Sequence, residues 1–114
     1  VLIKGLTFKE NVNDIRNSKV MDIIKYLKKE NINVYLEDKH VNNFELKKMY
    51  NYSLSNNIPK VDVVVFAVKH KEYYNMNIED LNNLYDNKYK IVFDIHGIFN
   101  KNELLERGFE VWRL

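Results

Sequence analysis

The stretch VDVVVFAV, residues 61–68, decides the fold class of this chain. It is almost continuously apolar and rich in β-branched residues, which is the composition of a strand covered on both faces within a parallel sheet. Residues 91–95 form a second buried strand further along the chain, and a helical pattern separates the two. A strand, a helix and a second strand in this order indicate a βαβ unit, and therefore an α/β domain.

Strands and helices continue to alternate on either side of this unit. Further strands are predicted at residues 1–6, 33–37 and 109–112, and further helices after Ser18, within residues 41–57, and between Asn100 and Gly108. The alternating order predicts a Rossmann-like three-layer α/β/α sandwich with a mainly parallel five-stranded sheet. No linker or internal repeat divides the chain, so residues 1–114 are expected to form one domain.

Polar residues mark the ends of the predicted helices. Asn17 or Ser18 can cap the first helix, because their side-chain oxygens accept from the free N–H groups of its first turn. Asn31 can take the left-handed conformation at the other end of that helix. Asn77, with Asp80 three residues later, has the pattern of a capping box before the third helix.

The composition excludes several classes of function. The chain has 114 residues, with 18 Lys and Arg against 16 Asp and Glu, so its net charge of +2 gives no excess for binding nucleic acid or a membrane surface. The absence of cysteine removes disulfides, thiolate zinc sites and cysteine nucleophiles. No apolar run reaches the ~18 residues of a membrane span and no signal peptide is recognisable, so a cytoplasmic protein is expected. The start in mid-strand at Val1, without Met, indicates a piece of a longer protein.

Histidine and tryptophan, two residue types that often carry function, are expected to have structural roles. His40 and His70 lie near predicted strand ends, but the chain has no cysteine and no close pairing of His with carboxylates at the spacing of metal ligands. We therefore expect no bound metal. Trp112, in the last predicted strand, is expected to lie in the core rather than to stack on a base.

The loop after the first strand, residues 5–17, is the first candidate for a ligand site. Open parallel sheets bind ligands beyond the carboxyl ends of their strands, where the strand order reverses. This loop has neither the Gly-x-Gly-x-x-Gly nor the Walker pattern. It carries Lys9 and Arg16, however, and leads into a helix N-terminus, which favours an anion such as phosphate. The alternative is a solvated loop in which Asp14 and Arg16 pair at the surface.

The same loop opens a set of motifs that is similar to one enzyme family. The block GLTFKENxxDIRNSKV (residues 5–20) closely resembles the start of the C-terminal domain of the UDP-glucose/GDP-mannose 6-dehydrogenase family. The blocks AVxHxE (67–72), FDxxG (93–97) and GFxxWRL (108–114) agree with the same family, so the resemblance covers nearly the whole chain. The form of the first block and the WRL ending look most like the branch that oxidises UDP-N-acetylhexosamines for bacterial surface polysaccharides.

The resemblance implies a specific oxidoreductase reaction. Members of the family oxidise the C6 hydroxyl of a nucleotide sugar to a carboxylate in two NAD-dependent steps, through a catalytic cysteine. Their N-terminal domain binds NAD, a central helical region carries the cysteine and forms the homodimer, and the C-terminal domain binds the nucleotide of the sugar donor. Residues 1–114 resemble the C-terminal domain alone, so this chain is expected to bind a UDP-sugar without turning it over.

The resemblance also implies roles for four residues. Phe8 and Lys9 would contact the nucleotide-sugar substrate, with Lys9 supplying positive charge and hydrogen bonds. Arg16 would reach toward NAD across the interdomain cleft. His96 stands where many relatives place an Arg or Lys against the substrate. Its imidazole could still hydrogen-bond to a phosphate or ribose oxygen, but its charge depends on pH. No catalytic and no metal-binding residue is expected in this chain.

Two other functions are compatible with the fold class alone. One is a non-catalytic α/β module for nucleotide binding or protein interaction that has kept the sheet and lost the pocket. The other is a response-regulator-like receiver, which is disfavoured because no acidic pair follows the first strand where a magnesium site would need it.

Overall fold

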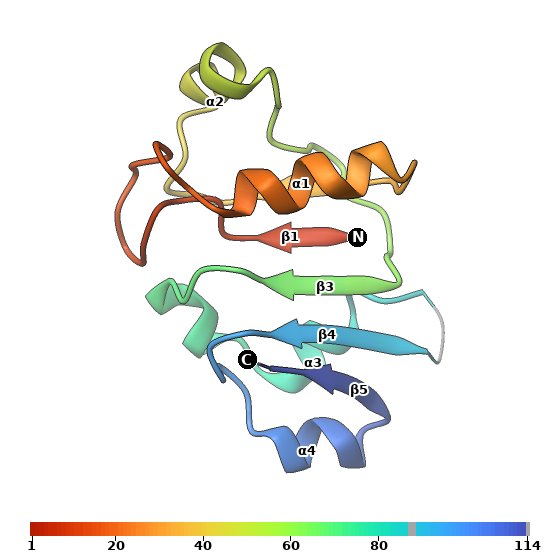
Figure 1. Cartoon of the computed structure of the whole chain (residues 1–114). Coiled ribbons are helices and arrows are strands. Elements are labelled where there is room, and N and C mark those ends of the chain that lie inside the picture. Colours follow the sequence, from red (N-terminus) through yellow and green to blue (C-terminus); the bar gives the residue numbers. More distant parts are fainter. Residues whose placement is uncertain (87–88, 114) are drawn as a thin grey trace.

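The predicted parallel sheet is confirmed by the computed structural model, which describes residues 1–86 and 89–113 (Figure 1). Five strands lie in the order β2-β1-β3-β4-β5, and all neighbouring pairs are parallel. The strands are β1 (Leu2–Lys4), β2 (Tyr35–Glu37), β3 (Val63–Phe66), β4 (Lys90–Asp94) and β5 (Phe109–Trp112). The helices are α1 (Val20–Lys29), α2 (Asn43–Tyr50), α3 (Ile78–Asn82), α4 (Lys101–Glu106) and the short 3₁₀ helix η1 (Lys71–Asn75).

The hydrophobic stretch that contains β3 lies at the centre of the sheet, as its composition predicts. Val64 and Phe66 are fully buried on one face, and Val65 is buried on the other. Each face carries its own hydrophobic core. The first core joins β3 to η1, α3 and α4 through Tyr73, Leu81 and Leu104. The second joins β1 and β3 to α1 and α2 through Ile3, Ile24 and Leu46.

The predicted helix ends are confirmed in part. Asn77 accepts a hydrogen bond from the Asp80 amide at 2.8 Å and Asp80 accepts one from the Asn77 amide at 3.1 Å, so the capping box before α3 is present. Asn31 takes the left-handed conformation, with φ of 60°.

The prediction that Asn17 or Ser18 caps α1 is wrong. Helix α1 begins at Val20, after Lys19, and none of the described side chains caps it. Asn17 is in the left-handed conformation, with φ of 58°. The Ser18 hydroxyl points back to the Thr7 carbonyl oxygen, 3.5 Å away. These two residues therefore stabilise the loop after β1 and do not cap the first turn of α1.

Gly5 allows that loop to pack against the end of β3. It has a φ of +101°, and a Cβ placed on it would lie 2.8 Å from the Val68 Cβ and 2.9 Å from the Val68 amide nitrogen. Both its conformation and its closeness to Val68 therefore exclude a side chain. The segments that follow β1 and β3 therefore lie against each other beyond the carboxyl ends of these strands.

Trp112 is not in the core, so that prediction is also wrong. Its side chain is 52% exposed and stacks on Phe93, with ring centroids 6.1 Å apart and planes inclined by 15°. Both rings point away from the core that covers Val92. No helix in residues 1–86 or 89–113 has the length and hydrophobicity needed to cross a membrane.

Candidate functional site

A groove with a volume of about 330 Å³ lies beyond the carboxyl ends of β1, β3 and β4. Four segments form its walls: residues 7–10 after β1, residues 17–20 at the start of α1, residues 67–69 after β3, and His96 after β4. From β1 the chain crosses to β2 on one side, and from β3 it crosses to β4 on the other. The groove therefore lies at the switch point of the strand order, where ligands bind in sheets of this type.

The groove brings three of the four predicted site residues together. Phe8 and Lys9 line it from the β1 loop, and His96 faces them from the β4 loop. Phe8 is 58% exposed, which leaves its ring open to a ligand. The Nε2–H of His96 donates to the Ala67 carbonyl oxygen at 3.2 Å, because a carbonyl can only accept. That bond fixes the imidazole on the rim of the groove.

The walls of the groove carry an excess of positive charge. Lys9, Lys19 and Lys69 line it together with one carboxylate, Glu10. The pKa of Glu10 is lowered by a hydrogen bond from its own backbone amide and by the charges of Lys69, Lys9 and His96. Lysines from the segments after β1 and after β3 thus act on the same place, which favours an anionic ligand.

A buried histidine anchors the β1 loop. The Asn11 amide donates to Nδ1 of His70 at 2.9 Å, and the Asn11 side-chain oxygen accepts from the Lys71 amide at 2.8 Å. Since Nδ1 accepts, the proton lies on Nε2, which donates to Oδ2 of Asp38 at 2.9 Å. The side chains of His70 and Asp38 are fully buried. The conformation of the loop therefore depends on a pair of residues outside the groove.

Asp38 connects this pair to two further backbone groups. Its carboxylate accepts from the Leu6 amide at 2.8 Å and from the His40 amide at 2.8 Å, in addition to His70. No motif in the sequence pointed to Asp38. Its position directly after β2 is the signal that could have found it, because the carboxyl ends of β2 and β1 meet at the same edge of the sheet.

No His or carboxylate residues are paired at metal-ligand spacing along the sequence, but the fold brings His40, His70 and Glu72 together. Nε2 of His40 lies 2.8 Å from Oε1 of Glu72, a contact that becomes an ion pair when the imidazole is protonated. The His40 ring lies against the ring of His70, with centroids 4.2 Å apart and planes inclined by 35°. The possible ligand atoms of His40, His70 and Glu72 lie within 4.8 Å of one another. Both nitrogens of His70 are already bonded, however, so only two groups are left for a cation, fewer than the three protein ligands usual for catalytic zinc.

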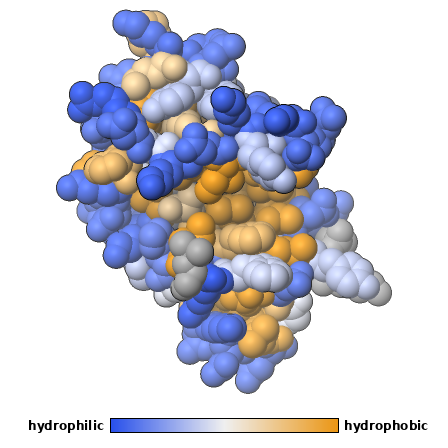
Figure 2. Space-filling model, in the orientation of Figure 1, coloured by the Kyte–Doolittle hydropathy of each residue, from blue (hydrophilic) through white to orange (hydrophobic). Residues whose placement is uncertain are grey.

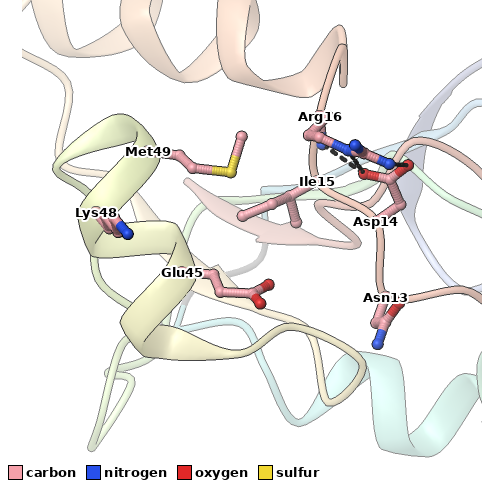
Figure 3. Close-up of a pocket in the computed structure, with 7 residues that line it drawn as sticks. All are labelled: Asn13, Asp14, Ile15, Arg16, Glu45, Lys48 and Met49. Carbon is pink, nitrogen blue, oxygen red and sulfur yellow. Dashed lines mark hydrogen bonds and ion pairs between the residues drawn. The ribbon is translucent and has the colours of Figure 1, made fainter.

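Arg16, the fourth predicted site residue, lies outside the groove. Its Nε is 3.1 Å from Oδ1 of Asp14 and its Nη2 is 3.3 Å from Oδ2, so the two side chains form a forked pair at the surface (Figure 3). This pair lowers the pKa of Asp14 and raises that of Arg16. Together with residues of α2 such as Glu45 and Met49, it lines a separate cavity of about 580 Å³. The structure thus shows the surface pair expected as the alternative, and the role of Arg16 toward NAD stays a prediction.

Fold and groove together define a Rossmann-like α/β domain with a cationic groove at the switch point of a parallel sheet. The family described as "UDP-glucose/GDP-mannose dehydrogenase family, UDP binding domain" matches residues 2–101. The chain therefore belongs to this family, within its UDP binding domain.

Several curated relatives are similar to this chain over most of its length. Protein CapL of Staphylococcus aureus is 44% identical over 116 aligned residues, which cover 100% of this chain and 27% of CapL. The UDP-N-acetyl-D-mannosamine dehydrogenase of Methanocaldococcus jannaschii is 33% identical, with 100% and 26% covered. The UDP-N-acetyl-D-glucosamine 6-dehydrogenase of Pseudomonas aeruginosa is 38% identical, with 78% and 23% covered. The chain thus spans about a quarter of the length of the curated relatives it matches.

Solved structures confirm the fold. The NDP-N-acetyl-D-galactosaminuronic acid dehydrogenase from Methanosarcina mazei Go1 superimposes with a TM-score of 0.85 at 17% identity, covering 98% of this chain and 24% of that one. The UDP-N-acetyl-mannosamine dehydrogenase Cap5O from S. aureus gives a TM-score of 0.66 at 24% identity, covering 98% and 25%.

Proposed function

We propose that residues 1–114 are the C-terminal substrate-binding domain of a longer NAD-dependent UDP-sugar 6-dehydrogenase. The substrate is a UDP-N-acetylhexosamine, whose C6 hydroxyl the whole enzyme oxidises to a uronate for surface polysaccharide synthesis in the cytoplasm. Membership of the UDP binding domain family and the names of the similar dehydrogenases support this proposal. The observation that carries it is the groove that gathers Phe8, Lys9 and His96 at the switch point of the sheet.

The chemistry of the groove suits a nucleoside diphosphate. Lys9, Lys19 and Lys69 supply the charge for two phosphates, and ammonium groups bind phosphate oxygens by charge-assisted hydrogen bonds. The exposed Phe8 ring offers an apolar surface beside them. His96 has Nδ1 left for the ligand, because Nε2–H is bonded to Ala67. As a neutral imidazole it accepts from a ribose hydroxyl at Nδ1, and as an imidazolium it donates to a phosphate oxygen.

The reaction itself requires groups that this chain does not hold. The 114 residues contain no cysteine, so the nucleophile belongs to the central region of the longer enzyme, which also forms the homodimer. NAD is bound mainly by the N-terminal domain, with Arg16 reaching toward it from the cavity that Arg16 lines together with α2. The 114-residue chain alone is inactive.

Titration calorimetry with UDP tests the proposal on the 114-residue chain. UDP binds weakly because only part of the pocket is present, and Lys9→Ala lowers the affinity about tenfold, the value of one charge-assisted hydrogen bond of about 1.4 kcal/mol. Lys25→Ala is the matched control, since Lys25 is exposed on α1 outside the groove. Equal effects of the two substitutions, or no heat of binding at millimolar UDP, would favour the non-catalytic module instead.

A further inference from the structure

One acidic side chain lies within the cationic groove. Glu10 is the single carboxylate among the described residues that line it, beside Lys9, Lys19 and Lys69. Phosphate oxygens are negatively charged, so a carboxylate next to them weakens the binding of a diphosphate. A groove that received phosphate alone would gain affinity by losing Glu10. Its presence therefore indicates a ligand that brings other chemical groups to this place.

The backbone on both sides of Glu10 is fixed. On one side, Oγ1 of Thr7 donates a hydrogen bond to the carbonyl oxygen of Lys9 at 2.7 Å. On the other side, the amide of Asn11 donates to Nδ1 of the buried His70 at 2.9 Å. These bonds hold the backbone of Glu10 at the groove without using its side chain. Glu10 itself is only partly buried, so its carboxylate is accessible to a ligand.

The carboxylate of Glu10 is an available acceptor at neutral pH. A hydrogen bond from its own backbone amide and the charges of Lys69, Lys9 and His96 lower its pKa, so the group is ionised. Within residues 1–86 and 89–113 it takes part in none of the ion pairs. An ionised carboxylate accepts at about four lone-pair sites on its two oxygens and cannot donate. Beyond the bond to its own amide, Glu10 therefore has sites for donors of a ligand.

Among the parts of a nucleotide sugar, hydroxyl groups match such an acceptor. The phosphates mainly accept, whereas the ribose and the hexosamine both carry neighbouring hydroxyls that can donate to the two oxygens of one carboxylate. An acidic side chain binds a ribose hydroxyl in dinucleotide-binding Rossmann folds. Figure 2 shows a mainly hydrophilic surface at the left of the view, where the loops beyond the carboxyl ends of the strands lie. This edge of the sheet thus suits a polar ligand.

We infer that Glu10 is a specificity-determining residue of the groove, whose carboxylate accepts hydrogen bonds from neighbouring hydroxyl groups of the nucleotide sugar. This inference rests on the proposed function, since it requires a nucleotide sugar in the groove. The three lysines outweigh the single carboxylate, so the groove still attracts the diphosphate. The lysines bind the phosphates and Glu10 binds a sugar ring. That ring is the ribose or the hexosamine, which offer the same chemistry.

Titration calorimetry of the 114-residue chain with three ligands tests this inference. Inorganic pyrophosphate carries phosphates only, UDP adds the ribose with its base, and UDP-N-acetylglucosamine adds a hexosamine. Glu10→Ala removes the charge and both acceptor oxygens, whereas Glu10→Gln removes the charge and keeps one acceptor oxygen. Glu106→Ala is the matched control, because Glu106 is exposed at the end of α4, outside the groove.

The expected effects of Glu10→Ala have opposite signs. Pyrophosphate should bind about twofold more tightly, the effect of removing one like charge at roughly 8 Å in water. UDP-N-acetylglucosamine should bind about tenfold more weakly, because a charge-assisted hydrogen bond is lost. An equal loss for UDP assigns the hydroxyls to the ribose, and a loss confined to UDP-N-acetylglucosamine assigns them to the hexosamine. Glu10→Gln should strengthen pyrophosphate binding equally and weaken the other binding less.

Two results would overturn the inference. Tighter or unchanged binding of all three ligands to Glu10→Ala would show that Glu10 acts only as a charge beside the phosphates. Weaker binding of all three, pyrophosphate included, would show that the substitution distorts the loop. The proposed function has a different failure, in which UDP and UDP-N-acetylglucosamine bind the unmodified chain no more tightly than pyrophosphate does. That result would remove the proposed substrate and the role of Glu10 together.

Discussion

Asp38→Ala is predicted to destabilise the domain by about 3–5 kcal/mol. The substitution removes the acceptor of three hydrogen bonds, from the amides of Leu6 and His40 and from Nε2 of His70. Leaving the buried donors of Leu6 and His70 unpaired costs about 1–2 kcal/mol of folding free energy each. The partly buried His40 amide adds about 1 kcal/mol to this cost. A domain of 114 residues has a total stability of about 6–17 kcal/mol, so the predicted loss is roughly a fifth to four fifths of it.

Urea denaturation followed by circular dichroism measures this loss directly. In thermal denaturation of the same variant, the melting temperature should fall by roughly 10–20 °C, at about 4 °C per kcal/mol for a domain of this size. Asp22→Ala is the matched control, because Asp22 is exposed in the first turn of α1 and is worth less than about 1 kcal/mol. A loss below about 1 kcal/mol for Asp38→Ala, or one equal to that of the control, would refute the role of Asp38 as the anchor of the loop.

Three further substitutions test other parts of the structure. Gly5→Ala places a Cβ 2.8 Å from that of Val68 at a φ of +101°, so it should cost about 2–4 kcal/mol in denaturation experiments and weaken UDP binding by displacing the loop. Asn77→Ala removes the α3 cap, which should cost about 1 kcal/mol by the same measurement and leave the calorimetric affinity for UDP unchanged. Burial acts to raise the pKa of Glu72, but its own backbone amide and His40 hold that pKa below its ordinary value of 4.5. Its contribution to stability is therefore present above that value and lost as the pH falls through the lowered pKa, so Glu72→Gln should destabilise the protein at neutral pH and progressively less as the pH falls through that pKa; an effect that does not change with pH would contradict this.

The sheet could be predicted from the sequence because its strands depend on local patterns. Residues 61–68 and 91–95 are apolar and β-branched whatever surrounds them, and α/β alternation then fixes a parallel arrangement. The meeting of Phe8 and Lys9 with His96 follows from the same topology, since the carboxyl ends of β1, β3 and β4 share one edge.

Features that depend on distant partners could not be predicted in this way. The His70 side chain bonds to groups 59 and 32 residues away, so no local pattern reveals the anchor of the β1 loop. Ser18 has the chemistry of a helix cap, but Thr7 of the folded loop competes for its hydroxyl. Trp112 lies in a strand with the alternation of a buried one, and the alternation does not tell whether a helix covers that face.

The central claim is that the groove beyond β1, β3 and β4 binds the nucleotide of a UDP-sugar. Amide chemical-shift mapping by NMR during a UDP titration tests this claim most directly, because it locates the ligand residue by residue. The account predicts that the shifts concentrate in residues 7–10, 17–20 and 67–69 and at His96. Shifts confined to the cavity around Arg16 and Glu45, or none at millimolar UDP, would contradict it.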